Sequence, residues 1–380
     1  MNINDFLLEA NGFASEFLSS YCVINGGIFD LKRVENLGFE QFALLTKNSV
    51  PLKLYKYFPD KTITDDKGNK INYSISALQD NTVFLQNPLQ FDDIYDSDIN
   101  IEFFEYEYLR LKTYCTKCGI KTKDDDTTQE LGNAFVQELY AHFIKNKSFD
   151  NLFKKKPVSE IEKLTNQKFI YSLIIELQNN SNLAEVVSKI IWNEYCEFLE
   201  ELRTTFRISC FSTTPYSQLM WGGSYADCHK GFCIEYTVLP NDEIYRDIYY
   251  NLFPMIYCKT RPNVVNELYK LKDSSVTKDT LWNIYFNGAL RKSIDWAFQN
   301  EWRLLLPIKS KDTSNYNVKF FPITKVFLGN RMSKERRKEI INICKEKNIP
   351  YIGVRRKNDA FEMEECNIKC EDCAKFTQIE

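Results

Sequence analysis

The sequence predicts an α+β protein in which a mixed, mostly antiparallel sheet is interrupted by a large helical insertion. Short runs of β-branched and aromatic residues, bounded by Gly, Pro and Asn, are typical of strands. The block 99–205 instead repeats apolar residues at helical spacing. Near the end of the chain, strand, helix and strand follow one another as in a βαβ unit. The expected strands of the sheet are 52–58, 82–86, 206–212, 231–238, 255–258, 301–306 and 323–328.

Composition limits the classes of protein that fit. The 380 residues are 44% hydrophobic, which is enough for a large core in one big domain or two. With 49 basic and 52 acidic side chains, the net charge of −3 gives no overall basic field that would attract nucleic acid or an anionic membrane. The first 22 residues are too polar for a signal peptide, and no apolar run is long enough to span a bilayer. We therefore expect a cytoplasmic protein without a membrane partner.

The pattern divides the chain into five segments. Asp5 is placed to cap an amphipathic helix over 5–21, and a second long helix is expected over 276–299. In the central block, apolar residues recur every four positions from Leu131 to Phe143. The expected segments are 1–50, a helical N-terminal cap; 51–98, the first part of the α+β core; 99–205, a helical insertion; 206–355, the second part of the core; and 356–380, an acidic tail that bears cysteines.

We expect the site in residues 206–238, because their pattern predicts a strand, a capped short helix and a second strand. The run Ser212-Thr213-Thr214 is expected to cap the helix that carries Trp221. A helix N-terminus reached from the end of a strand can hold an anionic group with its backbone N–H groups. A phosphate-bearing ligand therefore fits this stretch.

Two groups of carboxylates are further candidates. Residues 91–98 hold four Asp, which indicates either a solvated turn or a site for a divalent cation or a basic ligand group. Glu301 opens a strand beside Trp302, where a carboxylate removed from water can do chemistry. The other interpretation of Glu301 is a surface carboxylate paired with Arg303 or Lys292.

The twelve cysteines, in a chain without a secretory segment, indicate thiols in a reducing compartment. Two pairs have the spacing of zinc ligands, and they could form one four-cysteine site if the fold brings them together. The long gap between the pairs instead favours thiols on a loop and on the tail. The four residues are Cys115, Cys118, Cys370 and Cys373.

Several motifs in one order resemble a bacterial family, the domain of unknown function numbered twenty-nine seventy-one. The resemblance spans 52–355, apart from the helical region. Two places depart from the family pattern: Asp92-Asp93-Ile94-Tyr95 stands where Asn-Asp-Pro-Phe is usual, and Tyr225 lacks the His that often precedes it. The motifs are Leu54–Tyr57, Leu85–Asp96, Leu219–Trp221 continuing through His229–Glu235, Glu301–Arg303 and Ile323–Ser333.

The order of three elements is also similar to the ADP-ribosyltransferase superfamily. Its signature is a basic residue or His on the first strand, a strand with Ser or Thr before a short helix, and a Glu on a late strand. Lys56, Ser212-Thr213 and Glu301 stand at these places, although Lys lacks the bidentate fork of Arg. The resemblance implies an enzyme that transfers ADP-ribose from NAD, such as a bacterial toxin or phage-defence effector, acting on a nucleic acid or protein and associated with a neutralising or sensor partner.

In this interpretation Glu301 stabilises positive charge on the sugar, and Tyr225 assists it or stacks on the nicotinamide ring. The residues expected to bind NAD are Tyr55, Lys56, Ser212, Thr213, Trp221 and His229.

Two other functions remain open. A metal-dependent nuclease or phosphohydrolase would use carboxylates as ligands of a divalent ion. A non-enzymatic sensor would instead line a recognition pocket with Trp221, Tyr225 and His229. The carboxylates available to the nuclease are Asp93, Asp96, Glu235 and Glu301.

Overall fold

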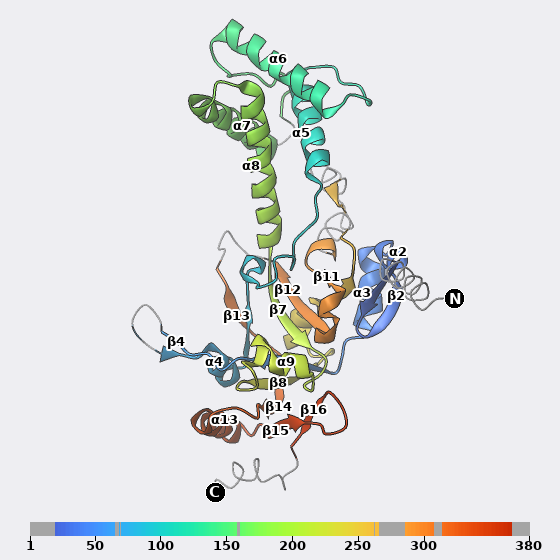
Figure 1. Ribbon diagram of the computed structural model, residues 1–380, viewed down its shortest axis with the longest axis vertical. Helices are drawn as coiled ribbons and strands as arrows, with labels where there is room; N and C mark the ends of the chain where they lie inside the picture. Colours follow the sequence, from blue (N-terminus) through green and yellow to red (C-terminus); the bar gives the residue numbers. More distant parts are fainter. Residues whose placement is uncertain are drawn as a thin grey trace, which may run out of the picture. The chain divides into compact units, whose positions relative to one another are not determined.

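The computed structural model describes residues 20–64, 68, 70–157, 160–261, 263–265, 286–307 and 314–366 (Figure 1). The chain forms two compact units. Unit 1 comprises Met1–Ser97, Thr204–Arg261 and Gly288–Glu380, and unit 2 comprises Asp98–Arg203 and Pro262–Asn287. Most of the helix predicted over 5–21 lies outside the described residues. Within the part of the chain that is described, no helix combines the length and the apolar character that crossing a bilayer requires.

Unit 1 contains an eight-stranded sheet with the order β16-β15-β14-β8-β3-β7-β12-β9. Only β14 and β15 run parallel, and the other neighbours are antiparallel. The prediction of a mixed, mostly antiparallel sheet is therefore confirmed. The strands are β3 (Lys53–Phe58), β7 (Phe206–Ser212), β8 (Phe232–Thr237), β9 (Leu252–Pro254), β12 (Glu301–Pro307), β14 (Ile323–Leu328), β15 (Tyr351–Arg356) and β16 (Met363–Glu365).

Smaller sheets complete unit 1. A four-stranded sheet has the order β11-β10-β1-β2, and two pairs join β13 to β6 and β4 to β5. The predicted strands 82–86 and 255–258 thus form, but they lie outside the eight-stranded sheet. These strands are β1 (Tyr21–Ile24), β2 (Gly27–Asp30), β4 (Ile63–Thr64), β5 (Lys70–Ile71), β6 (Thr82–Leu85), β10 (Ile256–Cys258), β11 (Arg291–Ser293) and β13 (Tyr316–Lys319).

Short helices connect and cover these strands. The prediction of a helix over 276–299 is wrong at the C-terminal end of that range. There, residues 291–293 form a strand that pairs with β10, and Ser293 caps a separate 3₁₀ turn. The helices are α2 (Leu31–Glu35), α3 (Phe39–Lys47), α4 (Tyr73–Asp80), α9 (Gln218–Gly222), α10 (Arg246–Tyr250) and α13 (Lys334–Glu346), and the 3₁₀ turns are η1 (Pro88–Gln90), η2 (Ser224–Ala226), η3 (Glu243–Tyr245) and η4 (Ile294–Gln299).

The two faces of the eight-stranded sheet differ in what covers them. On one face, Leu54 and its neighbours pack with the buried residues of α4 and α13 in the main hydrophobic core. We call this the core face. On the other face, Tyr55 and Tyr57 pack with residues of α9 and η2, such as Trp221 and Ala226. This second face, here called the site face, also carries the polar side chains described below.

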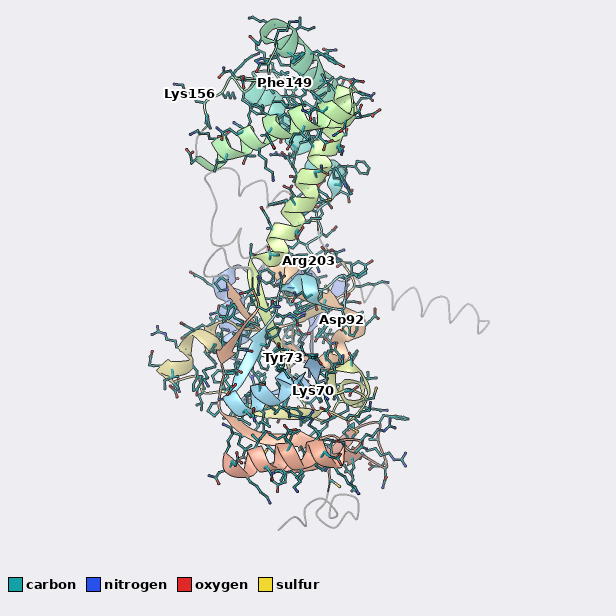
Figure 2. The ribbon with its side chains drawn as sticks, turned by 90° about the vertical axis from the view of Figure 1, so that its left-hand side faces the viewer. Lys70, Tyr73, Asp92, Phe149, Lys156 and Arg203 are labelled. Carbon is teal, nitrogen blue, oxygen red and sulfur yellow. The ribbon has the colours of Figure 1, made fainter. Side chains whose placement is uncertain are left out.

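Four helices of unit 2 that lie within the described residues share one core. Leu131, Phe135 and Leu139 lie in this core as predicted, whereas Phe143 is 43% exposed. Phe149, labelled in Figure 2, is buried in the same core. A capping box between Thr127 and Glu130 starts the second helix. The helices are α5 (Phe103–Cys118), α6 (Thr128–Asn146), α7 (Glu160–Asn179) and α8 (Leu183–Thr204).

Candidate functional site

A row of polar residues crosses five adjacent strands of unit 1. In this row, Glu301 is paired with Ser212, Ser212 with Tyr55, Tyr55 with Glu235, and Glu235 with Lys325. Residues that face each other in antiparallel strands project to the same side of a sheet. All five side chains therefore lie on the site face, and we call them the polar row.

Lys56 projects to the opposite face, because successive side chains of a strand alternate. Its ammonium group donates to Ser209 Oγ at 3.1 Å and to the carbonyl of Cys210 at 3.0 Å, and it lies 5.2 Å from the centre of the Phe211 ring. Burial lowers the pKa of Lys56. The position of Lys56 therefore gives no support to the prediction that it binds the diphosphate of NAD on the site face, where Tyr55 is the residue of this strand that joins the row.

Glu301 ends the polar row within a cluster of buried charges. Its carboxylate accepts from Arg303 Nε at 2.5 Å and from Lys292 Nζ at 3.2 Å. Asp96 pairs with the same two cations, at 2.6 Å from Arg303 and 3.1 Å from Lys292. Arg303 is fully buried, and Glu301 is 5% exposed. Two carboxylates thus balance two cations, and we call these four residues the charge cluster.

The charge cluster holds its carboxylates in the ionised form. Burial by itself raises the pKa of Glu301, but Arg303 and Lys292 lower it, and the net shift is downward. The pKa of Asp96 is lowered in the same way, against the effect of burial. Each carboxylate also stabilises the cations, so the pKa of Lys292 is raised although burial opposes this. The sequence allowed two interpretations of Glu301. The first is right that the carboxylate is buried, and the second is right that it is paired, here with both Arg303 and Lys292.

Tyr225 is connected to Glu301 through two intermediate side chains. Gln299 donates from its amide nitrogen to the Tyr225 hydroxyl, and its oxygen accepts from Lys292 at 3.0 Å. Burial raises the pKa of Tyr225 to about 12, so the phenol is neutral at physiological pH. The two residues that the sequence suggested for catalysis are therefore linked. Gln299, which links them, was missed because it lies in the turn predicted as helix.

The short helix α9 differs from the sequence-based expectation. Its cap is Ser217, whose Oγ accepts from the N–H of Met220 at 3.4 Å. Ser212 Oγ instead accepts from the N–H of Thr214 at 3.3 Å and closes a local turn that includes the half-buried Thr213. The prediction that Ser212-Thr213-Thr214 caps α9 is wrong. Because α9 has only five residues and its own cap, its N-terminus supplies no argument for a bound phosphate.

Trp221 belongs to the core of the site face. It is fully buried, its indole N–H donates to the carbonyl of Pro215 at 2.7 Å, and its ring meets Tyr57 edge to face at 5.4 Å. The His229 ring lies parallel to the indole, with 6.4 Å between the ring centres. Burial and the nearby Arg331 lower the pKa of His229. These contacts give Trp221 a packing role and leave His229 as a neutral side chain at the edge of the site face.

The turn that carries His229 has an unusual backbone. Asp227, Cys228 and His229 all have positive φ, at 46°, 51° and 69°. The glycine that follows permits a close approach of two chains, because a Cβ on Gly231 would lie 2.0 Å from the carbonyl oxygen of Phe58. The sequence signal for this turn was Gly231 itself, but three consecutive left-handed residues cannot be predicted from their residue types.

Glu235 lies at the other end of the polar row and is also buried. It accepts from Lys53 at 2.7 Å, from the Tyr55 hydroxyl at 3.0 Å and from Thr324 at 2.9 Å. Burial raises its pKa, but these donors lower it, and the net shift is downward. The row therefore holds an ionised carboxylate near each end, with Tyr55 and Ser212 between them.

The geometry does not favour the metal-dependent alternative. Glu235 and Glu301 are three strand spacings apart, about 14 Å, which is too far to share one ion. Asp93 accepts from the N–H of Tyr95 at 2.9 Å and closes a turn. Among the described residues, no three His, Cys, Asp or Glu side chains are grouped as metal ligands.

The cysteines suggested for zinc lie in different surroundings. Cys115 and Cys118 are buried in the core of unit 2, where burial raises their pKa to about 11 and about 12. Both are therefore neutral thiols in this structure. Cys370 and Cys373 lie outside the described residues, so the four-cysteine hypothesis stays a prediction.

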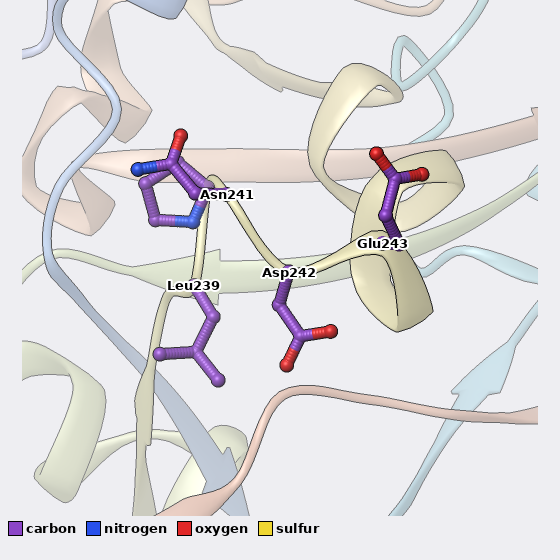
Figure 3. Close-up of a pocket in the computed structure, with 5 residues that line it drawn as sticks. Leu239, Asn241, Asp242 and Glu243 are labelled. Atoms are coloured by element: carbon purple, nitrogen blue, oxygen red, sulfur yellow. The ribbon is translucent and has the colours of Figure 1, made fainter.

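An open hollow of ≈ 540 Å³ lies at the turn that follows β8 (Figure 3). It is lined by residues 239–243, and Asp242 there accepts from the N–H of Ile244 at 2.9 Å, which caps η3. None of the residues predicted to bind NAD lines this hollow. Because Asp242 is used to cap η3, we do not assign this hollow to the candidate site.

Comparison with known proteins gives one match. A family model described as "Protein of unknown function (DUF2971)" matches residues 220–304, which supports the family resemblance noted above over this part of the chain. The matched segment runs from α9 to β12 and includes Tyr225, His229, Glu235, Glu301 and Arg303. Neither a curated protein nor a solved structure matches the chain.

Proposed function

We propose that the protein is an NAD-dependent ADP-ribosyltransferase-like enzyme whose reaction centre is the Glu301 end of the polar row. The observation that carries the proposal is the register of three strands. Tyr55, Ser212 and Glu301 are far apart in the chain, yet they are direct cross-strand neighbours on one face. They lie on the first strand, the Ser-bearing strand and the late Glu-bearing strand that the resemblance singled out, with Tyr55 in place of Lys56.

The reaction breaks the bond between nicotinamide and ribose and forms a bond from the ribose to an acceptor. Nicotinamide leaves with the electron pair of the broken bond, and positive charge develops on the sugar. A carboxylate that is already ionised and fixed in place stabilises this charge without reorganising. Arg303 and Lys292 keep Glu301 ionised, and the strand keeps it in place. The acceptor gives up its proton as the new bond forms.

The neighbours of Glu301 fit supporting roles. Tyr225 accepts a hydrogen bond from Gln299, so its own hydroxyl proton remains available to donate to a substrate oxygen. Ser212 and Tyr55 bring hydroxyl groups to the same face.

The experiment is nicotinamide release from NAD by the purified protein, with and without bacterial RNA, DNA and lysate, in the presence of a chelator. Glu301→Gln keeps the size of the side chain and removes its charge, and we expect it to lower release by about 10²-fold or more. Glu194→Gln is the matched control, because Glu194 is also paired with a buried arginine, Arg110, at 2.5 Å.

The outcome separates the functions. Release that resists the chelator, falls in Glu301→Gln and persists in Glu194→Gln supports the transferase. The additive that accelerates release identifies the acceptor class. Absence of release under every condition by protein that is folded by circular dichroism, or equal release by both variants, would overturn the proposal.

A further inference from the structure

Unit 2 exposes an aromatic surface that the proposed reaction does not use. Phe104 is 71% exposed and Trp192 is 49% exposed. Phe103 and Tyr195 are half-buried behind them. These four residues come from the N-terminal end of α5 and from α8, and we call them the aromatic patch. Large exposed aromatic side chains that gather in one place mark interaction sites.

The rings of the aromatic patch hold one another in position. The Phe103 ring meets Trp192 at 4.9 Å and Tyr195 at 5.2 Å between ring centres, both edge to face. The Tyr195 hydroxyl donates to the carbonyl of Ile101 at 3.0 Å. Side chains that are already fixed lose little conformational entropy when a partner binds, so the patch is preorganised for binding.

Glutamates predominate in the two helix segments that carry the aromatic patch. Residues 102–109 and 192–201 contain seven glutamates and neither lysine nor arginine. Glu194 is paired with Arg110, and Glu197 is paired with Lys168. These two segments thus carry more acidic than basic side chains, which favours a cationic partner over nucleic acid or anionic lipid.

Glu107 adds a carboxylate at the patch itself. It follows Phe103 by four residues and Phe104 by three on α5, so the three side chains are neighbours on the helix surface. It is half-buried, and burial raises its pKa. Among the described residues, no cation is paired with Glu107. A partly desolvated carboxylate beside aromatic rings is therefore ready to accept a positive group.

We propose that the aromatic patch and Glu107 bind an arginine-bearing segment of a partner protein. The planar guanidinium group is weakly hydrated, stacks on aromatic rings and donates two parallel hydrogen bonds to a carboxylate. Trp192 and Phe104 supply the rings, and Glu107 supplies the carboxylate. This surface is independent of the polar row, so the partner can be bound whether or not the proposed reaction is correct.

The test measures binding of a labelled peptide in which Arg and Gly alternate, by fluorescence polarisation on the full chain. A peptide with Glu in place of Arg is the charge control. We expect Trp192→Ala and Glu107→Gln each to weaken binding by about fivefold. Tyr171→Ala and Glu160→Gln are the matched variants, because both residues are exposed on α7 of the same unit. Neither is expected to change the affinity.

Three results would overturn the proposal. The first is equal binding to all four variants, which indicates non-specific attraction by negative charge. The second is loss of binding in Trp192→Ala with no change in Glu107→Gln, which indicates an apolar partner. The third is absence of peptide binding together with a dimer that Trp192→Ala dissociates in sedimentation velocity, which makes a second copy of the chain the occupant.

Discussion

Glu301 lies directly opposite Ser212 in the antiparallel pair of β12 and β7. Tyr55 continues the same row on β3. The three residues thus meet although long stretches of chain separate them, and the pairing of the strands alone fixes which side chains share the site face. Arg303, two residues after Glu301 on the same strand, projects to the same face and pairs with it. The strand therefore supplies both the carboxylate and the cation that keeps it ionised.

Arg303→Met should destabilise unit 1 strongly. The substitution leaves Asp96 and Glu301 buried with Lys292 as their only partner in the charge cluster. Removing one member of a buried ion pair typically costs about 3–5 kcal/mol. Urea unfolding should show a loss of this size in the free energy of unfolding. The control is Lys168→Met, which removes an exposed pair with Glu197 and should change that free energy by about 1 kcal/mol or less. If Arg303→Met lowered the free energy of unfolding no more than Lys168→Met does, Arg303 would not stabilise the charge cluster.

Gly231→Ala should be far more damaging than Gly222→Ala. The new Cβ at position 231 would lie 2.0 Å from the carbonyl oxygen of Phe58, and backbone on both sides prevents relief. At position 222 the nearest atom is 3.8 Å away, in the His229 ring. We expect Gly231→Ala to cost about 3 kcal/mol or to prevent folding, as overpacking does. Thermal unfolding of the two variants side by side is the measurement, and similar midpoints would refute the close approach.

The sequence was informative where the pattern is local and uninformative where partners are distant. Runs of β-branched and aromatic residues predicted β3, β7, β8, β12 and β14, because such residues prefer strands. The same pattern did not show whether Tyr55 or Lys56 faces Glu301, since a shift of one residue moves a side chain to the other face. The pairing of Asp96 with Arg303 was also invisible, because only the folded sheet brings together residues that are 207 positions apart.

The thiols should differ sharply in reactivity. Among the described cysteines, Cys196 and Cys228 are exposed, whereas Cys115 and Cys118 are buried, with raised pKa values. Alkylation of native protein at pH 8 should therefore modify the first pair and spare the second, because only an accessible thiolate reacts. Mass spectrometry of the peptides identifies the modified residues. Fast labelling of Cys115 or Cys118 would show that the core of unit 2 opens.

Lys47 should make stability depend on pH between neutral and alkaline conditions. Its ammonium group donates to the carbonyls of Tyr249 and Leu252, yet burial lowers the pKa of Lys47 from 10.5 to about 7. Between these two values the unfolded chain binds more protons than the folded chain, so the free energy of unfolding rises with pH. Urea unfolding from pH 7 to 9.5 should show this rise in the natural protein. Lys47→Met should make this rise smaller, and an equal rise in both proteins would exclude Lys47 as a cause.

Tyr55→Phe and Lys56→Met distinguish the two faces of β3 in the proposed reaction. Tyr55 lies in the polar row, so loss of its hydroxyl should lower nicotinamide release several-fold while removing one hydrogen bond to Glu235, worth about 1 kcal/mol of stability. Lys56 is buried against Ser209 on the core face, so Lys56→Met should change stability and leave the rate per folded molecule as it was. Release rates at equal concentrations of folded protein, with thermal unfolding in parallel, make the comparison. If Lys56→Met lowered release and Tyr55→Phe did not, the assignment of the first-strand position to Tyr55 would be wrong.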